Sequence, residues 1–303
     1  MPLDGQISYA ELSECCGLAE ADTRRVVRAA MSLRIFEEDG TGGVQHNAAS
    51  AILATRPAHD ALGFFTEEYT PGALKLSEAL RRFPDSEKAA ESAIAIANGI
   101  VGDIDIFSSI ARDSERVERL ANAHSFITMV PETSLQNFVH NVPWATEESS
   151  TCPKVVVDVG GSNGDLCEAL LRAYPGITKA IVEDLPEVTS INLKHGAPED
   201  LSGRMEYRAY DFFQQQELAD ADVYIFRTVL HDWPDDYVVR ILRNQIPVFK
   251  TGARILINDI CIESSRRMNT IMSQPQWYVE CPHVAFLKVG SNSNTDLRIV
   301  RLI

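Results

Sequence analysis

A run of β-branched residues that stops at a glycine-rich turn constrains the fold of this chain more than any other feature. Residues 155–170 read VVVDVGGSNGDLCEAL, in which four valines and Asp158 lead into three glycines. After the glycines, apolar residues recur at helical spacing. Glycine lets the backbone approach a ligand closely, and a helix N-terminus presents unpaired N–H groups. The sequence therefore predicts a strand, a turn and a helix that bind a nucleotide-like cofactor.

From Lys154 onward, strand-like and helix-like segments alternate. The strand-like segments read VVVDV, AIVED, MEYRAYDFF, DVYIFRTVL and RILINDICI. This alternation predicts an α/β domain with a doubly wound, Rossmann-like parallel sheet. Ligands bind at the carboxyl ends of the strands in such sheets. We therefore expect five polar residues to share one edge of the sheet: Asp158, Asp184, Asp211, His231 and Asp259.

The first 100 residues predict a separate, smaller domain that is essentially all-helical. Ser8 can cap a helix over residues 9–16 that Gly17 closes, and residues 21–33 repeat apolar positions at helical spacing. Residues 35–46, IFEEDGTGGVQH, have two short strand-like ends around a glycine-rich turn. This order predicts a winged-helix domain over residues 1–100, followed by a catalytic domain over residues 101–303.

The charge balance narrows the choice of ligand. Lys and Arg total 28 against 43 Asp and Glu, a net charge of -15, which disfavours nucleic acid and anionic membranes as partners. Arg24, Arg25 and Arg28 would favour DNA binding, but the predicted wing is acidic. We also find neither an export signal nor an apolar run of the ~18 residues that a membrane span requires. We expect a cytoplasmic protein with a small-molecule substrate, no metal site and reduced cysteines.

The spacing of the glycines bears on the class of cofactor. A dinucleotide-binding turn has the pattern G-x-G-x-x-G, whereas this chain reads D-x-G-x-S-x-G from Asp158 to Gly164. That spacing favours S-adenosylmethionine over a nicotinamide dinucleotide, and we find no hydride-transfer residues near the turn. Asp184, twenty residues after Gly164, is placed to accept hydrogen bonds from ribose hydroxyls with either cofactor.

Residues 226–236, FRTVLHDWPDD, are followed by a predicted helix and by INDICIE at residues 257–263. With ISYAELSECCGL, VVDVGGSNGDLCEALL, VEDLPEV and YDFF in the same order, the chain resembles the caffeate-type O-methyltransferases of plants and fungi over roughly residues 7–263. The resemblance implies transfer of a methyl group from S-adenosyl-L-methionine to a phenol or enol hydroxyl of a small secondary metabolite. It also implies that His231 is the general base and that Asp259 orients it.

A histidine suits this role because its unperturbed pKa of about 6.5 lies near neutrality, and an adjacent carboxylate fixes its tautomer. The resemblance places Gly160 and Gly161 against the methionine portion of the cofactor. The other implied cofactor contacts are Asp158, Asp184, Asp211, Phe212 and Arg227, and the substrate contacts are Asp232, Phe126 and Met129. Core packing is the alternative for Phe212, Phe213, Phe126 and Met129, and we expect Trp233 to pack in the core.

Both ends of the chain depart from the family pattern. The family forms a homodimer partly through a helical segment ahead of the winged helix, which has no counterpart before Ile7. Beyond Glu263 the sequence diverges, and we expect DLRIVRLI at residues 296–303 to form a late strand whose partner strand is missing. The second acid that would flank His231 is not assigned. Two alternatives therefore stay open: a cyclisation or pericyclic reaction that retains the cofactor, and an inactive partner protein.

Overall fold

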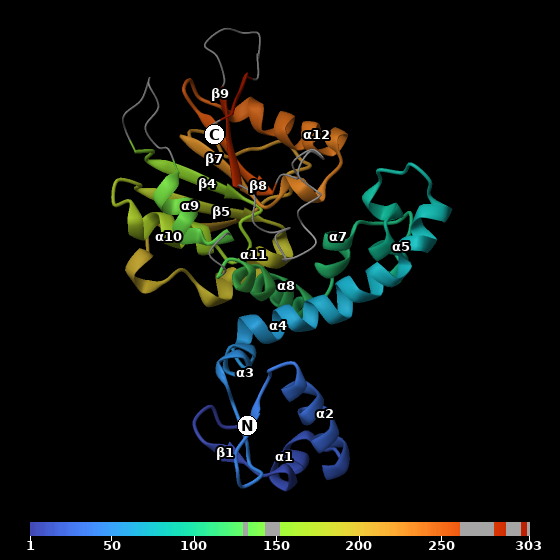
Figure 1. The fold of residues 1–303 in the computed structure, drawn as a ribbon. Helices are drawn as coiled ribbons and strands as arrows, with labels where there is room; N and C mark the ends of the chain where they lie inside the picture. The colour runs from blue at the N-terminus through green and yellow to red at the C-terminus, as the bar shows by residue number, and fades with distance from the viewer. Residues whose placement is uncertain (130–132, 143–151, 261–281, 289–297, 302–303) are drawn as a thin grey trace. The chain divides into compact units, whose positions relative to one another are not determined.

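The computed structural model describes residues 1–129, 133–142, 152–260, 282–288 and 298–301, and it places side chains up to residue 259. The chain forms two compact units, Met1–Gly63 and Phe64–Ile303 (Figure 1). Among the described residues, no helix is both long and apolar enough to cross a membrane. Cys15, Cys16, Cys152 and Cys167 are free thiols, while Cys261 and Cys281 lie outside the described residues.

The first unit combines short helices with a small sheet. Its elements are β1 (Gln6–Ile7), α1 (Tyr9–Cys16), α2 (Glu20–Ser32), β2 (Glu37–Glu38), β3 (Val44–Gln45) and α3 (Ala48–Leu53), followed by α4 (Arg56–Phe64). Ser8 and Glu11 form a capping box at the start of α1, and Gly17 adopts a left-handed conformation (φ 65°) at its end, as predicted. The hairpin of β2 and β3 is also confirmed.

The expectation of an otherwise all-helical unit is wrong in one respect. β1 pairs with β3, so the hairpin becomes a three-stranded antiparallel sheet with the order β1-β3-β2. A strand of two residues is too short to produce a periodic signal in the sequence. The arginines of α2 are also paired: Arg24 with Glu20, Arg25 with Asp22, and Arg28 with Glu38.

The second unit begins with a series of helices: η1 (Phe65–Tyr69), α5 (Thr70–Arg82), η2 (Ala89–Glu91), α6 (Ala93–Asn98), α7 (Ile106–Ile110), α8 (Ser114–Ile127) and α9 (Leu135–Asn141). The first four of these, up to Asn98, fall within the range predicted for the first domain. The compact units thus divide at Gly63, whereas the predicted boundary lies near residue 100. Long-range pairing explains the difference, because Arg116 of α8 donates hydrogen bonds to Glu68 of η1 at 2.7 and 3.0 Å.

A seven-stranded sheet organises the rest of the second unit. Its strands are β4 (Val155–Val159), β5 (Lys179–Asp184), β6 (Met205–Ala209), β7 (Val223–Arg227), β8 (Arg254–Ile260), β9 (Pro282–Lys288) and β10 (Arg298–Arg301), in the order β10-β9-β8-β7-β4-β5-β6. The five strands from β6 to β8 in this order are parallel, which confirms the predicted Rossmann-like sheet. The last two strands are antiparallel to their neighbours.

The expectation that the late strand has no partner is wrong. β10 lies within DLRIVRLI and pairs with β9, which in turn pairs with β8. The pairing partner is the segment PHVAFLK at residues 282–288. An antiparallel strand needs no connecting helix, so the strand-helix alternation used to identify the other strands gives no signal for this one.

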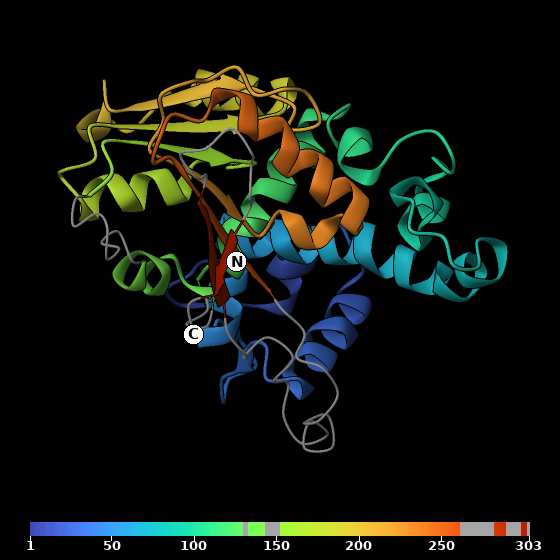
Figure 2. The ribbon, with the colours of Figure 1, turned by 90° about the horizontal axis from the view of Figure 1, so that it is seen from above.

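Alternate residues of the central strands pack on opposite faces of the sheet. Val156 of β4 joins the apolar cluster beneath α9 and α10 (Asp165–Ala173), whereas Val157 and Val159 join the cluster that contains Ile241 of α12 (Asp235–Gln245). In Figure 1 the sheet lies between α10 and α12, and Figure 2 shows the two helices well apart. The remaining helices are α11 (Pro186–His195), η4 (Glu199–Leu201), η5 (Leu230–Asp232) and η6 (Ile246–Val248).

The strand order reverses at β4, which lies between β5 and β7. The loops that leave β4 and β7 in opposite directions therefore open a crevice at the carboxyl edge of the sheet. The glycine-rich turn follows β4, and the segment that carries His231 follows β7. The topology alone brings the two most informative sequence motifs to the same edge.

Candidate functional site

The glycine-rich turn is held against the neighbouring strand by its backbone. The N–H groups of Gly160 and Gly161 donate to the carbonyl oxygen of Glu183 at 2.7 and 3.2 Å. Gly160 has φ +76°, a conformation that favours glycine. A Cβ on Gly161 would lie 2.7 Å from Asp158 Oδ2 and 2.8 Å from Val182 Cγ1. Both glycines are therefore required by the geometry of the turn itself.

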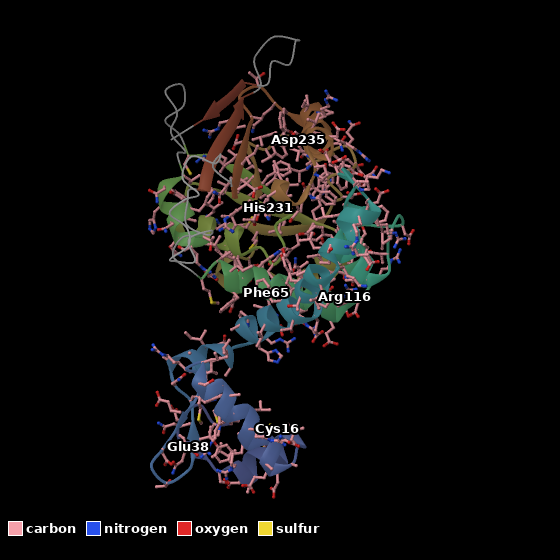
Figure 3. All side chains as sticks on the ribbon, turned by 45° about the vertical axis from the view of Figure 1, so that its right-hand side comes forward. Cys16, Glu38, Phe65, Arg116, His231 and Asp235 are labelled. Atoms are coloured by element: carbon pink, nitrogen blue, oxygen red, sulfur yellow. The ribbon has the colours of Figure 1, made fainter. Side chains whose placement is uncertain are left out.

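A cavity of about 680 Å³ in the second unit adjoins this turn. Asp158, Gly160 and Gly161 line it from the sheet, and the segment after β7 contributes His231, Asp232 and Trp233. The helices of the same unit contribute aromatic side chains, among them Phe64, Phe65, Tyr69 and Phe107. Figure 3 labels His231 near the sheet and Phe65 on the helical segment, two residues that line this cavity. A cavity of this size suits a small organic molecule.

His231 is oriented by Asp259 of β8. Its Nδ1 lies 2.5 Å from Asp259 Oδ1, while Asp259 Oδ2 accepts the backbone N–H groups of Leu230 and His231 at 2.9 and 3.1 Å. The hydrogen bond to Asp259 raises the pKa of His231, and the negative charge of Asp232 adds to the shift. The side chain of His231 is 36% exposed and lines the cavity. An imidazole held in this way can accept a proton at Nε2.

Asp232 lies on the other side of the imidazole, with Oδ1 3.4 Å from His231 Nε2. Burial raises the pKa of Asp232 to about 6, and the positive charge of His231 opposes that shift. The backbone just before this segment is strained, because the β-branched Thr228 has φ 53°. Strain of this kind is concentrated at functional sites, where surrounding contacts maintain it.

Asp158 and Arg227 place opposite charges at the base of the cavity. Asp158 is 3% exposed, and burial raises its pKa to about 7, while Arg227 opposes the shift. Burial also lowers the pKa of Arg227, whose Nη2 donates to the carbonyl oxygen of Thr133 at 2.6 Å. The Nε–H of Arg227 is buried and donates no hydrogen bond to any described residue. These groups form a polar floor beneath a largely apolar cavity.

Three of the expected cofactor residues lie at the same edge of the sheet but are not among the residues that line the cavity. Asp184 accepts the backbone N–H groups of Ser162 and Leu185, both at 2.8 Å. Asp211 accepts the N–H of Phe213 at 2.9 Å. The ring of Phe212 packs edge-on against Trp233, with centroids 5.8 Å apart. Asp184 and Asp211 thus shape loops next to the cavity.

The expected substrate residues are only partly brought together. Asp232 lines the cavity, whereas Phe126 is not among the lining residues and Met129 is 61% exposed. Trp233 packs in an aromatic cluster, as expected, but also lines the cavity. His124, which lies on α8 and also lines the cavity, was not among the residues predicted from the sequence. Helical spacing is the feature that could have identified His124, because it lies one turn from Leu120 and from Thr128, which both line the cavity.

Known proteins are similar to this chain in sequence and in fold. A protein-family model described as an O-methyltransferase domain matches residues 132–279. O-methyltransferase kk1A of Curvularia clavata is 33% identical over 269 residues, which cover 88% of this chain and 61% of that protein. O-methyltransferase pgmB of Aspergillus terreus is 33% identical over 265 residues, which cover 86% of this chain and 72% of that protein.

The chain belongs to the O-methyltransferase family. Among solved structures, the mitomycin 7-O-methyltransferase MmcR matches this O-methyltransferase fold with a TM-score of 0.70 at 27% identity, over 91% of this chain and 76% of that one. A structure described as a pericyclic reaction enzyme matches with a TM-score of 0.69 at 23% identity, over 86% of this chain and 66% of that one. The chain spans about six tenths of the length of the first curated relatives it matches.

Proposed function

We propose that this protein is an S-adenosylmethionine-dependent O-methyltransferase that acts on a phenol or enol hydroxyl of a small secondary metabolite, with His231 as the general base. The observation that carries the proposal is the pairing of His231 with Asp259 at 2.5 Å, at the wall of a cavity that the glycine-rich turn also lines. Membership of the O-methyltransferase family supports the reaction class.

The residues around the turn fit a cofactor with a cationic end. Asp158 offers a buried carboxylate at the cavity, and Asp165 lines it from the first turn of α10. Arg227 Nε–H is buried and donates no hydrogen bond to the described residues, which leaves one donor for a carboxylate. We propose that Asp158, Gly160, Gly161 and Arg227 hold the methionine end, and that the ribose and adenine lie beside Asp184, Asp211 and Phe212. When bound, S-adenosylmethionine supplies an electrophilic methyl group to the acceptor oxygen.

The chain's own contribution is proton transfer and alignment. Asp259 holds the proton of His231 on Nδ1, so Nε2 carries the lone pair that would take the proton of the acceptor hydroxyl. Asp259 and Asp232 then stabilise the imidazolium that forms. The aromatic walls orient a flat acceptor, and alignment of oxygen and methyl group accounts for most of the rate gain in such a reaction.

For the first unit we propose a winged-helix domain whose role is assembly of a homodimer. Its helices and three-stranded sheet are in the order expected for a winged helix. The ion pairs of Arg24, Arg25 and Arg28 neutralise the cations that DNA binding would use. We propose that the functional domains are a smaller domain over residues 1–100 and a methyltransferase domain over residues 101–303. We also propose a cytoplasmic location.

Calorimetric titration and an activity assay on the purified chain test the proposed function. We expect S-adenosylmethionine to bind and NAD not to bind, and we expect simple phenols to gain a methyl group. His231→Asn should abolish methyl transfer and leave cofactor affinity nearly unchanged. Turnover that survives in His231→Asn would exclude this base. Conversion of an acceptor without loss of the methyl group would favour cyclisation, and binding without any turnover would favour the inactive partner.

A further inference from the structure

One residue of the glycine-rich turn has a side chain and yet adopts a left-handed conformation. Positive φ angles alternate along the turn, with 76° at Gly160, 50° at Ser162 and 86° at Gly164. A residue with a Cβ is sterically strained in this conformation, whereas glycine is not. Ser162 also lines the cavity. Contacts with the surrounding protein must therefore hold Ser162 in place.

Both backbone groups of Ser162 are bound by side chains from β5 and α11. Its N–H donates to Asp184 Oδ2 at 2.8 Å, and its carbonyl oxygen accepts from Asn192 Nδ2 at 2.7 Å. Asp184 is the last residue of β5, and Asn192 lies further along the chain on α11. Asn192 is 6% exposed, so little water competes for its hydrogen bond. These two side chains fix the conformation of Ser162 from both sides.

The carboxylate of Asp184 can accept further hydrogen bonds while it holds the turn. Oδ1 accepts the N–H of Leu185 at 2.8 Å, and Oδ2 accepts that of Ser162. Each carboxylate oxygen has two lone pairs, so each can accept a second hydrogen bond, as two neighbouring ribose hydroxyls require. Burial raises the pKa of Asp184, and the N–H groups of Leu185 and Ser162 oppose that shift. The N–H of Ser162 thus helps to orient this carboxylate and to keep it ionised.

We infer that Asn192 is a positioning residue for the ribose of the cofactor, and that it acts through Ser162 on Asp184. Asn192 itself is not among the described residues that line the cavity. By binding the carbonyl oxygen of Ser162, it maintains the strained conformation in which the N–H of Ser162 points at Asp184. That N–H in turn orients the carboxylate toward the ribose hydroxyls. The inference rests on the proposed contact between Asp184 and the ribose.

Two ligands test this chain of contacts, S-adenosylhomocysteine and its analogue that lacks both ribose hydroxyls. Leucine has nearly the shape of asparagine, but Asn192→Leu leaves the carbonyl oxygen of Ser162 without its donor. We expect Asn192→Leu to weaken the binding of S-adenosylhomocysteine about 10-fold and that of the analogue less than about 2-fold, because the loss concerns the hydroxyls alone. The KM for S-adenosylmethionine should rise about 10-fold, while kcat stays within about 2-fold.

Glycine at position 162 removes the strain that Asn192 opposes. When Asn192→Leu is combined with Ser162→Gly, its additional effect on the affinity for S-adenosylhomocysteine should shrink from about 10-fold to about 2-fold, because glycine adopts the left-handed conformation without support. The same substitution outside the cavity gives the matched control. Asn141 on α9 donates to the carbonyl oxygen of Asn137 at 2.8 Å, and Asn141→Leu should leave both affinities unchanged.

The outcomes separate this inference from the proposed function. An equal loss for the two ligands in Asn192→Leu, no loss for either, or a loss that Ser162→Gly does not reduce would overturn the inference alone. If the wild type binds the two ligands equally well, the proposed contact between Asp184 and the ribose is wrong, and the inference fails with it. A wild type that does not bind S-adenosylhomocysteine would refute the proposed function itself.

Discussion

His231 and Asp259 are joined by two kinds of contact that act together. One carboxylate oxygen of Asp259 lies 2.5 Å from the imidazole Nδ1, and the other accepts the backbone N–H groups of Leu230 and His231. The same carboxylate therefore fixes the turn that carries the histidine and the tautomer of its ring. His231 follows β7 and Asp259 lies on the neighbouring strand β8, 28 positions further along the chain, so the pairing of these two strands sets this geometry.

Replacing Asp259 by asparagine separates these two effects. In Asp259→Asn the amide oxygen can still accept the backbone N–H groups, but the amide nitrogen donates toward Nδ1 and moves the ring proton to Nε2. We expect kcat to fall by about 100-fold or more, the size of a lost general base. Thermal unfolding should show a folded protein. An asparagine variant with wild-type kcat would show that the tautomer of His231 does not matter for the reaction.

The pH dependence of the reaction should follow the ionisation of His231. Its pKa is raised above 6.5, and only the neutral imidazole accepts a proton, so kcat/KM should rise with pH through a midpoint above 6.5. Asp232 contributes to that rise through its negative charge. In Asp232→Asn the midpoint should move to lower pH. A pH profile that is identical in the two proteins would contradict this assignment.

The glycine-rich turn should tolerate no side chain at Gly161. A methyl group there would meet Asp158 and Val182 at 2.7 and 2.8 Å, so Gly161→Ala must move the turn or the strand. We expect a loss of about 1–3 kcal/mol in the free energy of unfolding, together with weaker cofactor binding. Gly176→Ala is the matched control, because its nearest neighbours, atoms of Cys152, lie 3.5 Å away. Equal effects of the two substitutions would contradict the steric explanation.

The parts of the fold that the sequence predicted have local signals. The capping box at Ser8, the left-handed Gly17 and the strand-turn-helix at residues 155–170 each depend on residues close together in the chain. The five parallel strands followed from a repeated alternation, and the strand-end rule then placed His231 beside Asp259. For these elements, local propensity and topology agree.

What the sequence missed depends on contacts between distant segments. The compact units divide at Gly63 because segments about fifty positions apart pair with each other, as Glu68 does with Arg116, and no periodicity reveals such pairing. The functional division near residue 100 stays a proposal. β9 was missed because an antiparallel strand breaks the strand-helix alternation. Phe126 and Met129 were predicted as substrate contacts, but the face of this helical segment that lines the cavity carries His124 and neither of these two residues.

The ion pair of Glu68 and Arg116 should support the aromatic wall of the cavity. Glu68 lies in the π-helical turn η1, between the cavity residues Phe65 and Tyr69, and its carboxylate accepts two hydrogen bonds from Arg116. Arg116→Met leaves a nearly buried carboxylate without its cation, and we expect a loss of about 3 kcal/mol in stability and a higher KM. Urea unfolding and acceptor kinetics measure the two effects.

A double variant provides the control for this ion pair. In Glu68→Leu combined with Arg116→Met both charges are gone, and most of the lost stability should return, because no unpaired charge remains buried. If the double variant is as unstable as Arg116→Met alone, packing rather than charge is responsible for the effect.

Glu183 makes the stability of the sheet depend on pH. Its side chain is fully buried beside the glycine-rich turn, where Gln216 Nε2 donates to Oε2 at 2.6 Å and Oε1 has no hydrogen bond from a described residue. Burial raises the pKa of Glu183 from 4.5 to about 6. A raised pKa stabilises the folded protein below pH 4.5, where the carboxyl is protonated in both states, and this contribution disappears as the pH rises through about 6.

Glu183→Gln mimics the protonated carboxyl at every pH. At pH 8 we expect the variant to exceed the wild type by about 2 kcal/mol in the free energy of unfolding, and at pH 4.5 the two should agree within about 0.5 kcal/mol. Urea unfolding at the two pH values measures the difference, and Glu206→Gln on β6, an exposed carboxylate that pairs with Lys179, should show no such gain at pH 8. A gain for Glu183→Gln of the same size at both pH values would mean that packing, rather than the buried charge, limits stability at this position.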